Sequence, residues 1–398
     1  YMHTIGIVAE YNPFHSGHAY QLLQSKQLLG GDGAVVAVMS GNWVQQADCA
    51  IADKWIRARL ALLGGVDLVL ELPTVWAAAS AETFAFGAVS LLDSAGVVEH
   101  LSFGSELGEV APLRQVAEAL EAPDISQVLS PFLRRGLPFA AARQAALEET
   151  LGPAAAALSA PNNTLGIEYL RALSRLHSTI QPLTVRRAGA AHNSLAEETE
   201  HRSATQIRRS LRAGEGQRAA AYLHPDAPAL LLEAGLPSLD LVSRAVLARL
   251  RTMTARDWAA LPDSGAAEGL PQRLERAGRE CSSPEDFLTR CKTKRYAHAR
   301  LRRLLLWAYL GLTEADRPAA PPYLRVLGFN ARGQELLRQM KDRAALPILT
   351  KPAHAWDLDE PGRRLFQLEA RCTDLYDLCR RSIPAPGREW TTGPVVLR

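Results

Sequence analysis

The first hundred residues restrict the fold most, because apolar runs of strand length alternate there with segments of helical pattern. The apolar runs are Thr4–Ala9, Ala34–Met39, Val66–Leu72 and Val97–Phe103. The helix-like stretches between them are His18–Leu29, Ile51–Leu63 and Ala81–Leu92. Continuous apolar strands that alternate with helices indicate a parallel sheet covered on both faces. The sequence therefore predicts an α/β, Rossmann-like domain whose ligand binds beyond the carboxyl ends of the strands.

The rest of the chain is predicted to be mainly helical. We expect the α/β domain to span residues 1–212, with a helical insertion at about 108–178, and a basic helical C-terminal domain to span 213–398. Within these, the patterns predict a turn at Pro161–Thr164, a strand at Ile180–Val185, a helix at Ser203–Leu211, and a strand–helix–strand unit formed by Tyr323–Phe329, Gly333–Lys341 and Leu346–Thr350.

Composition excludes several classes of protein. The chain has 398 residues, 47% of them apolar, and a net charge of only +3, which suits a globular protein with local basic patches. Its five cysteines form no C-x-x-C pair, so we expect neither a disulfide framework nor a metal site. No run of 18 apolar residues and no signal peptide are seen, so we expect a cytoplasmic protein without membrane contact.

The turn after the first predicted strand reads His15-Ser16-Gly17-His18 and opens a helix. Two imidazoles at such a turn can face one bound anion, and the helix N-terminus adds unpaired N–H groups and partial positive charge. Preorganised donors aimed at developing charge are each worth about 10²–10³ in rate. We therefore predict that His15 and His18 stabilise charge on the α-phosphate of a nucleoside triphosphate. The absence of a G-x-x-x-x-G-K-[ST] sequence excludes a P-loop.

A second candidate phosphate site lies at Ser203, Thr205 and Arg208. Hydroxyls at a helix N-terminus, with an arginine on the first turn, can clamp a phosphate. A plain helix cap with a solvated arginine is the alternative. Because the histidine motif is present in the same chain, we favour the clamp.

Two further pairs of candidate ligand-binding residues lie next to predicted strands or helices. Arg186 and Arg187 end the strand Ile180–Val185 and thus point to the ligand-binding edge, although a charged strand terminus explains them equally well. Asn162 and Asn163 lie in the predicted turn, where asparagine commonly serves the backbone conformation.

A basic segment near residue 300 is the candidate RNA-binding surface. Half of the residues from Lys292 to Arg303 are Lys or Arg, which on a helix would form a face suited to RNA phosphates. An aromatic ring there can stack on a base. A solvated helix face is the alternative. We predict RNA contacts from Lys292, Lys294, Arg295, Tyr296, Arg300 and Arg303.

These motifs carry a family resemblance. The His15–His18 and Ser203–Arg208 segments resemble the paired motifs of the nucleotidyltransferase superfamily with an HxGH turn. Longer segments, in consistent order along most of the chain, resemble the bacterial tRNA(Met) cytidine acetate ligases. They are Glu10–His18, Met39–Gln45, Gly65–Pro73, Ser102–Glu106, Pro161–Leu170 and Lys294–Tyr296.

The resemblance implies an ATP-dependent ligase that uses acetate and no acetyl-CoA. It implies that acetyl-adenylate forms with release of pyrophosphate, that Mg²⁺ accompanies the ATP, and that the acetyl group passes to the exocyclic amine of the wobble cytidine of elongator tRNA(Met), giving 4-acetylcytidine. By the family pattern, ATP is bound by Val8, Ala9, Glu10, Tyr11, Asn12, Pro13, Phe14, His15, Ser16, Gly17, His18, Ala19, Tyr20 and Gln21, with Gly104, one of Asn162 and Asn163, and Arg187 with Ala188.

Two other functions remain open on the residues alone. An adenylyltransferase acting on a small metabolite would have the same phosphate-binding core but no need for a basic C-terminal segment. A non-catalytic RNA-binding protein would keep ATP as a structural ligand. The acetate-dependent tRNA ligase is our leading hypothesis.

Overall fold

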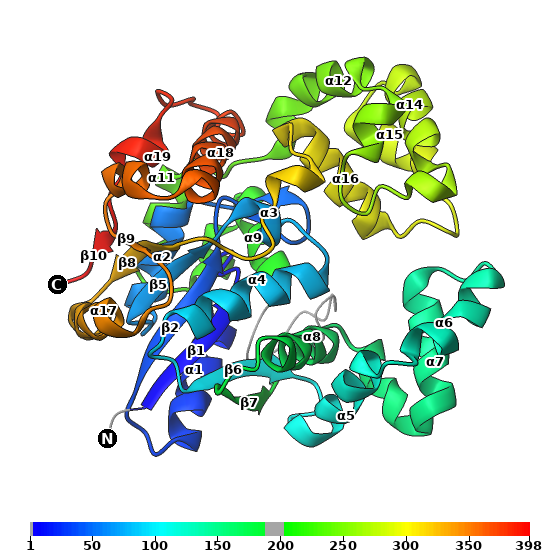
Figure 1. Ribbon diagram of the computed structural model, residues 1–398. Coiled ribbons are helices and arrows are strands. Elements are labelled where there is room, and N and C mark those ends of the chain that lie inside the picture. Colours follow the sequence, from blue (N-terminus) through cyan, green and yellow to red (C-terminus); the bar gives the residue numbers. More distant parts are fainter. Residues whose placement is uncertain (1–2, 188–202) are drawn as a thin grey trace.

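The computed structural model describes residues 3–187 and 203–398 (Figure 1). Its centre is a sheet in the order β10-β8-β5-β2-β1-β6-β7, with β9 paired to β8. The strands are β1 (His3–Ala9), β2 (Gly33–Ser40), β5 (Leu68–Leu72), β6 (His100–Ser105), β7 (Gln181–Arg186), β8 (Leu324–Phe329), β9 (Ile348–Leu349) and β10 (Val395–Val396). A separate short hairpin joins β3 (Trp43–Val44) to β4 (Asp48–Cys49).

The predicted parallel sheet is confirmed. β1 pairs in parallel with both β2 and β6, β2 pairs in parallel with β5, and β6 with β7. Strand β8 runs antiparallel to β5 and is the exception among these neighbours. The chain therefore has the Rossmann-like α/β fold that the alternating apolar runs predict.

Alternate residues of β2 enter two different hydrophobic cores. Val36 and Val38 face a core shared with α4 (Ala81–Ser94), α8 (Pro161–Arg175) and α17 (Ala331–Arg343). Val35 and Ala37 face a second core shared with α1 (Ser16–Leu28) and α2 (Lys54–Leu63). Side chains of a strand alternate between the two faces of a sheet. An uninterrupted apolar run such as β2 therefore requires helices on both faces, as found.

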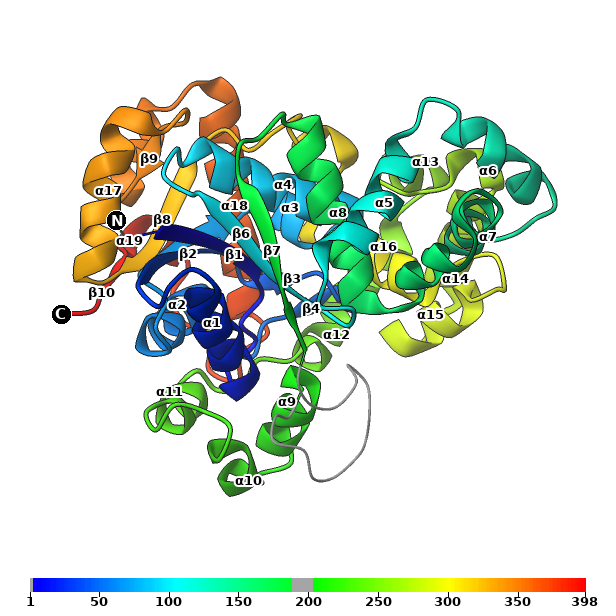
Figure 2. The same ribbon diagram turned by 90° about the horizontal axis from the view of Figure 1, so that it is seen from below.

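The remaining helices extend the molecule on either side of the sheet. Figure 1 shows one lobe formed by α5–α7 and another formed by α12–α16, and Figure 2 shows α9–α11 below the sheet. Their bounds are α3 (Thr74–Ala77), α5 (Val110–Glu121), α6 (Ile125–Arg134), α7 (Phe139–Leu151), α9 (Ala204–Arg212), α10 (Gly216–Ala220), α11 (Ala227–Glu233), α12 (Ser243–Thr252), α13 (Ala255–Ala259), α14 (Leu270–Glu280), α15 (Pro284–Cys291), α16 (His298–Leu310), α18 (Glu360–Asp377) and α19 (Arg388–Thr391).

The structure places the C-terminal residues differently from the sequence-based expectation. The predicted strand–helix–strand unit is present as β8, α17 and β9. However, β8 hydrogen-bonds to β5, and β10 extends the same edge. A boundary at residue 212 therefore does not separate the sheet from the helical part, because the last 75 residues or so return to complete the sheet. Pairing with β8 covers an otherwise exposed edge of β5.

Two local predictions are also corrected. The Pro161–Thr164 segment is the first turn of α8 rather than a turn before it, because proline is well tolerated at a first helical position. Residues 292–297 are not helical, and α16 begins only at His298.

A cluster of buried charges joins the C-terminal residues to the first domain. The ammonium group of Lys54, on α2, lies 2.6 Å from a carboxylate oxygen of Glu71 and 2.6 Å from one of Glu389. All three side chains are at most 2% exposed. Glu71 lies on β5 and Glu389 on α19, so this ion cluster links elements that are more than 300 residues apart.

In the part of the chain that the structure describes, none of the helices combines the length and apolar character needed to cross a bilayer.

Candidate functional site

A cavity of about 310 Å³ lies beyond the carboxyl ends of β1, β6 and β7. Its size is within the range of pockets that bind small molecules. Predicted residues that line it are Val8, Ala9, Glu10, Tyr11, Asn12, His15, Gly17, His18, Tyr20, Gln21, Gly104, Asn162, Arg187, Ser203 and Arg208. The structure thus brings together most of the positions predicted from five separate segments.

His15 and His18 both line this cavity, with ring centroids 4.0 Å apart. The Nδ1 atom of His15 accepts a hydrogen bond from the backbone N–H of Gly17, at 3.0 Å. The Nδ1 atom of His18 accepts one from the backbone N–H of His15, at 3.3 Å. A neutral imidazole that accepts at Nδ1 carries its proton on Nε2. Both rings are therefore held by the backbone in the tautomer that can donate from Nε2.

The position between the two histidines requires glycine because the ring of His15 packs closely against it. A Cβ atom at Gly17 would lie 2.9 Å from Cε1 of His15, inside normal contact distance. Burial, the charge of His15 and that of Arg187 lower the pKa of His18 well below its ordinary value. His18 is therefore neutral at pH 7 and acts as a hydrogen-bond donor.

The N-terminal ends of three helices contribute to the cavity. They belong to α1, α8 and α9, which supply His15, Asn162 and Ser203 respectively from their first turns or caps. Unpaired N–H groups and the helix dipole make each such end favourable for anions. Three of them beside Arg186, Arg187 and Arg208 indicate a ligand with several negative charges.

Asn162 and Asn163 have different surroundings. Asn162 lines the cavity, accepts a hydrogen bond from Arg187 at 2.8 Å and donates one to Glu106 at 2.7 Å. Asn163 is 3% exposed, and its side-chain oxygen accepts from the backbone N–H groups of Glu106 and Leu107. Asn162 is therefore placed to position Arg187 at the cavity, whereas Asn163 holds the turn after β6.

The Ser203–Arg208 segment caps a helix and also reaches the cavity. Ser203 caps α9, since its hydroxyl accepts from the backbone N–H of Gln206, and it also lines the cavity. Arg208 donates to the backbone oxygen of Asn12 at 2.8 Å and to the hydroxyl of Thr205 at 3.2 Å. Burial lowers the pKa of Arg208, and the carboxylate of Glu10 opposes this. Such a partly desolvated guanidinium favours contact with an anion.

Arg57 is a positioning residue that the sequence analysis did not identify. Its guanidinium is fully buried and donates to the backbone oxygens of Glu10, Ser40 and Gly41. It therefore ties the carboxyl end of β1 to that of β2. No signal in the sequence singles it out, because the stretch Ile51–Leu63 also contains Asp53, Lys54 and Arg59.

Glu10 is the only acidic side chain among the described residues that line the cavity. It accepts a hydrogen bond from the backbone N–H of Gln45 at 2.7 Å. Burial raises the pKa of the Glu10 carboxyl, while that hydrogen bond and the charge of Arg208 act against the rise.

Other predicted positions lie elsewhere. Pro13, Phe14, Ser16, Ala19, Asn163 and Thr205 do not line the cavity, and Ala188 falls outside the described residues. Phe14 instead packs on Gly64, where any Cβ atom would collide with its ring. The turn after β2 also follows a strand at this edge of the sheet, but Asn42 there is buried and caps α2 by accepting from the N–H of Lys54. Gln45 and Gln46, a few residues later, reach the cavity in its place.

The residues of the basic segment are divided between surface and interior. Lys292, Lys294 and Arg295 are exposed. Tyr296 is 8% exposed and its hydroxyl donates to the backbone oxygen of Glu268, so its position does not suit the predicted stacking on a base. Arg300 pairs with Glu268, and Arg303 lies 3.9 Å from Asp263.

Comparison with known proteins places this fold and cavity in a family. A family model described as HIGH Nucleotidyl Transferase matches residues 2–387. The tRNA(Met) cytidine acetate ligase of Caldanaerobacter subterraneus subsp. tengcongensis is 39% identical over 393 residues, covering 96% of each chain. That of Clostridium kluyveri is 35% identical and covers 100% of this chain and 99% of the other.

Solved structures agree with these relatives. Thermotoga maritima TmcAL in its apo form has a TM-score of 0.94 to this chain, at 31% identity and full coverage of both chains. The same protein bound with alpha-thio ATP has a TM-score of 0.91, also at 31% identity and full coverage. The chain therefore belongs to the HIGH nucleotidyltransferase family and, within it, to the family of the tRNA(Met) cytidine acetate ligases.

Proposed function

We propose that the protein activates acetate with ATP and transfers the acetyl group to the exocyclic amine of the wobble cytidine of elongator tRNA(Met). The observation that carries this proposal is the cavity itself, in which His15, His18, Arg187, Arg208 and three helix N-termini meet. The names of the relatives and the ATP analogue bound by the Thermotoga maritima protein support the choice of substrates.

In the first step, a carboxylate oxygen of acetate attacks the α-phosphorus of ATP. A P–O bond forms, the bond to the β-phosphate oxygen breaks, and pyrophosphate leaves with its electron pair. Negative charge grows on the α-phosphate oxygens and on the leaving group. The Nε2–H groups of His15 and His18 would stabilise the charge on the α-phosphate oxygens. Arg187 and Arg208 would stabilise the triphosphate as a whole.

In the second step, the amine nitrogen of cytidine attacks the acetyl carbonyl carbon. A C–N bond forms, the bond from the carbonyl carbon to the bridging oxygen breaks, AMP leaves with that oxygen and its electron pair, and the nitrogen loses one proton. Acetyl-adenylate reacts with water, so the cavity must hold it apart from bulk solvent until the base arrives. A wobble base lies in a single-stranded loop and can be turned outward at modest cost.

Mg²⁺ would arrive bound to the triphosphate oxygens, as it commonly does in nucleotide-binding sites. Glu10 is the one carboxylate of the described cavity that could add a protein ligand, but it already accepts a hydrogen bond from Gln45. None of the roles assigned to the side chains above depends on the ion.

The first test is ATP–pyrophosphate exchange. Exchange should require acetate and should fall about 10²–10³-fold in His18→Ala. His354→Ala, which removes an exposed histidine, is the matched control and should exchange normally. Exchange that occurs with a small phosphorylated metabolite but never with acetate would favour an adenylyltransferase. Mass spectrometry of tRNA after incubation with ATP and labelled acetate tests the second step, and absence of label on cytidine would refute it.

We further propose that Lys292, Lys294 and Arg295 contact tRNA phosphates. They are exposed, unlike Tyr296, and lie just before α16. Replacing all three by alanine should weaken tRNA binding and reduce its salt dependence, because fewer counterions are released. Acetate-dependent exchange should persist. A double variant at the exposed residues Arg338 and Lys341 of α17 serves as the control. An equal loss of tRNA affinity in the triple variant and in the control variant would refute a specific contact.

A further inference from the structure

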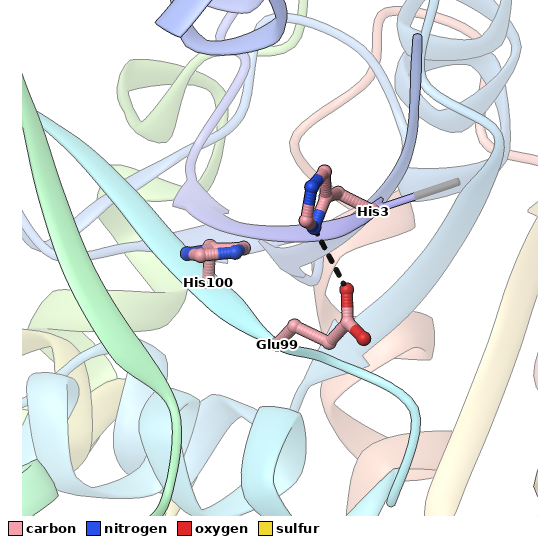
Figure 3. A group of neighbouring side chains, drawn as sticks. All are labelled: His3, Glu99 and His100. Carbon is pink, nitrogen blue, oxygen red and sulfur yellow. Dashed lines mark hydrogen bonds and ion pairs between the residues drawn. The ribbon is translucent and has the colours of Figure 1, made fainter. Parts of the chain in front are cut away.

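His3, Glu99 and His100 meet at the amino ends of β1 and β6, at the edge of the sheet opposite the ATP cavity (Figure 3). One ligand atom from each side chain lies within 4.8 Å of the other two. Within residues 3–187 and 203–398, no other group of three or more His, Cys, Asp or Glu side chains meets this spacing. The cysteine pattern predicted no metal site, and these three residues come from two separate segments of the chain.

The distances within the cluster suit a shared cation. Nδ1 of His3 lies 3.3 Å from a carboxylate oxygen of Glu99. Two ligands of a tetrahedral zinc ion, at metal–ligand distances near 2.0–2.1 Å, lie about 3.4 Å apart. The rings of His3 and His100 have centroids 5.3 Å apart and an interplanar angle of 74°. Figure 3 shows both rings and the carboxylate on the same side of the sheet edge.

The backbone holds the three side chains on paired strands. In the parallel pairing of β1 with β6, Ile5 lies opposite His100. The backbone N–H of Glu99 donates to the oxygen of Thr4 at 3.0 Å, and the N–H of Thr4 donates to the Glu99 carboxylate at 3.2 Å. Ligands on strands are positioned more accurately than ligands on loops. The Thr4 contact also fixes the carboxylate from outside the ligand set, as commonly seen at metal sites.

The charges and exposure of the cluster favour a divalent cation. Each of the two histidines offers a ring nitrogen as a ligand atom. The Glu99 carboxylate supplies one negative charge. The side chains of His3 and Glu99 are 35% and 32% exposed, so an ion can enter from solvent and keep a water ligand.

We propose that His3, Glu99 and His100 bind one divalent transition-metal cation, with Zn²⁺ the best fit and water as the fourth ligand. Two imidazoles and one carboxylate are a known zinc ligand set, and imidazole favours such metals over Mg²⁺ or Ca²⁺. The bound ion joins the start of β1 to the start of β6, which are far apart in the sequence. This proposal is independent of the reaction proposed above.

Calorimetric titration of the untagged, metal-stripped protein with ZnCl₂ and CoCl₂ tests the site. We expect saturation at one equivalent, the visible absorption of four-coordinate Co²⁺, a higher melting temperature with Zn²⁺, and no response to MgCl₂. Glu99→Gln and His100→Ala should each weaken Zn²⁺ binding by more than about tenfold. Removing a residue that only hydrogen-bonds to a metal ligand already weakens binding by about tenfold, and removing a ligand should weaken it more.

A second histidine–carboxylate pair provides the matched control. His224 lies 3.9 Å from Asp226 and its side chain is 32% exposed, but no third ligand completes that pair among the described residues. His224→Ala should therefore leave Zn²⁺ binding unchanged. ATP binding by Glu99→Gln shows that the variant is folded. Absence of saturable Zn²⁺ binding, or equal affinity in the wild type and both ligand variants, would overturn the proposal.

Discussion

Replacing Lys54 by methionine should destabilise the protein strongly, because its ammonium group lies within hydrogen-bond distance of two buried carboxylates, those of Glu71 and Glu389. Methionine keeps most of the side-chain volume, so a cavity adds little to the effect. Although burial lowers the pKa of Lys54, the carboxylates of Glu389 and Glu71 raise it above its ordinary value, so the lysine is charged in the folded state. Removing one partner of a buried ion pair costs about 3–5 kcal/mol.

The structure also predicts which of the two carboxylates is destabilised more when Lys54 is replaced. Glu389 keeps a hydrogen bond from the Thr373 hydroxyl at 2.8 Å and lies 3.8 Å from Arg325. For Glu71, the described contacts show a hydrogen bond from Lys54 alone. Glu71 should therefore be the less stable carboxylate in Lys54→Met.

Urea denaturation of three variants measures these effects. Lys54→Met should lower the free energy of unfolding by about 3–5 kcal/mol. Adding Glu71→Gln should recover a large part of that loss, and adding Glu389→Gln should recover less. A loss below about 1 kcal/mol, the range of surface pairs, would refute the reasoning. Equal recovery by the two glutamine substitutions would refute the assignment of the less stable carboxylate.

Three further predictions follow from other residues. Asn162→Ala should raise the KM for ATP in pyrophosphate exchange with little change in melting temperature, because it releases Arg187. Asn163→Ala should instead lower the free energy of unfolding by about 1–3 kcal/mol, since two backbone N–H groups lose their acceptor, and equal effects on KM would contradict this division. Burial first, and the charge of Glu71 next, raise the pKa of Glu369 to about 8. Its carboxyl thus stays protonated in the folded state while the unfolded chain ionises near pH 4.5, so stability falls as pH rises from about 4.5 to 8, by at most ~1.4 kcal/mol per pH unit. Glu369→Gln should reduce that slope in denaturation series, and an unchanged slope would exclude this residue as its source.

Features that depend on neighbouring residues in the chain were predictable. The apolar run at β2 requires cover on both faces, and the turn after β1 must bring His15 and His18 to the start of one helix. These follow from strand and helix geometry over about ten residues. The rule that ligands bind at the carboxyl edge then placed Arg187 near His15 and His18, and all three line one cavity.

Features that depend on partners distant in the sequence were not predictable in this way. Asn162 and Asn163 are adjacent and chemically identical, yet one lines the cavity and the other is buried under the turn after β6. The helix that begins at Pro161 turns the two side chains in different directions. Tyr296 was expected on a basic helix face, but that stretch is not helical and its ring packs inward.

The sequence by itself therefore determined the α/β class and the phosphate-binding turn, because both rest on periodicity and on residues close together in the chain. Only the tertiary structure decided that β8 and β10 complete the first sheet, that Arg57 ties β1 to β2, and that His3 meets Glu99 and His100. The physical reason is the same in each case. Strand pairing and burial bring together groups that are far apart in the chain, and the local sequence pattern does not show that these groups are in contact.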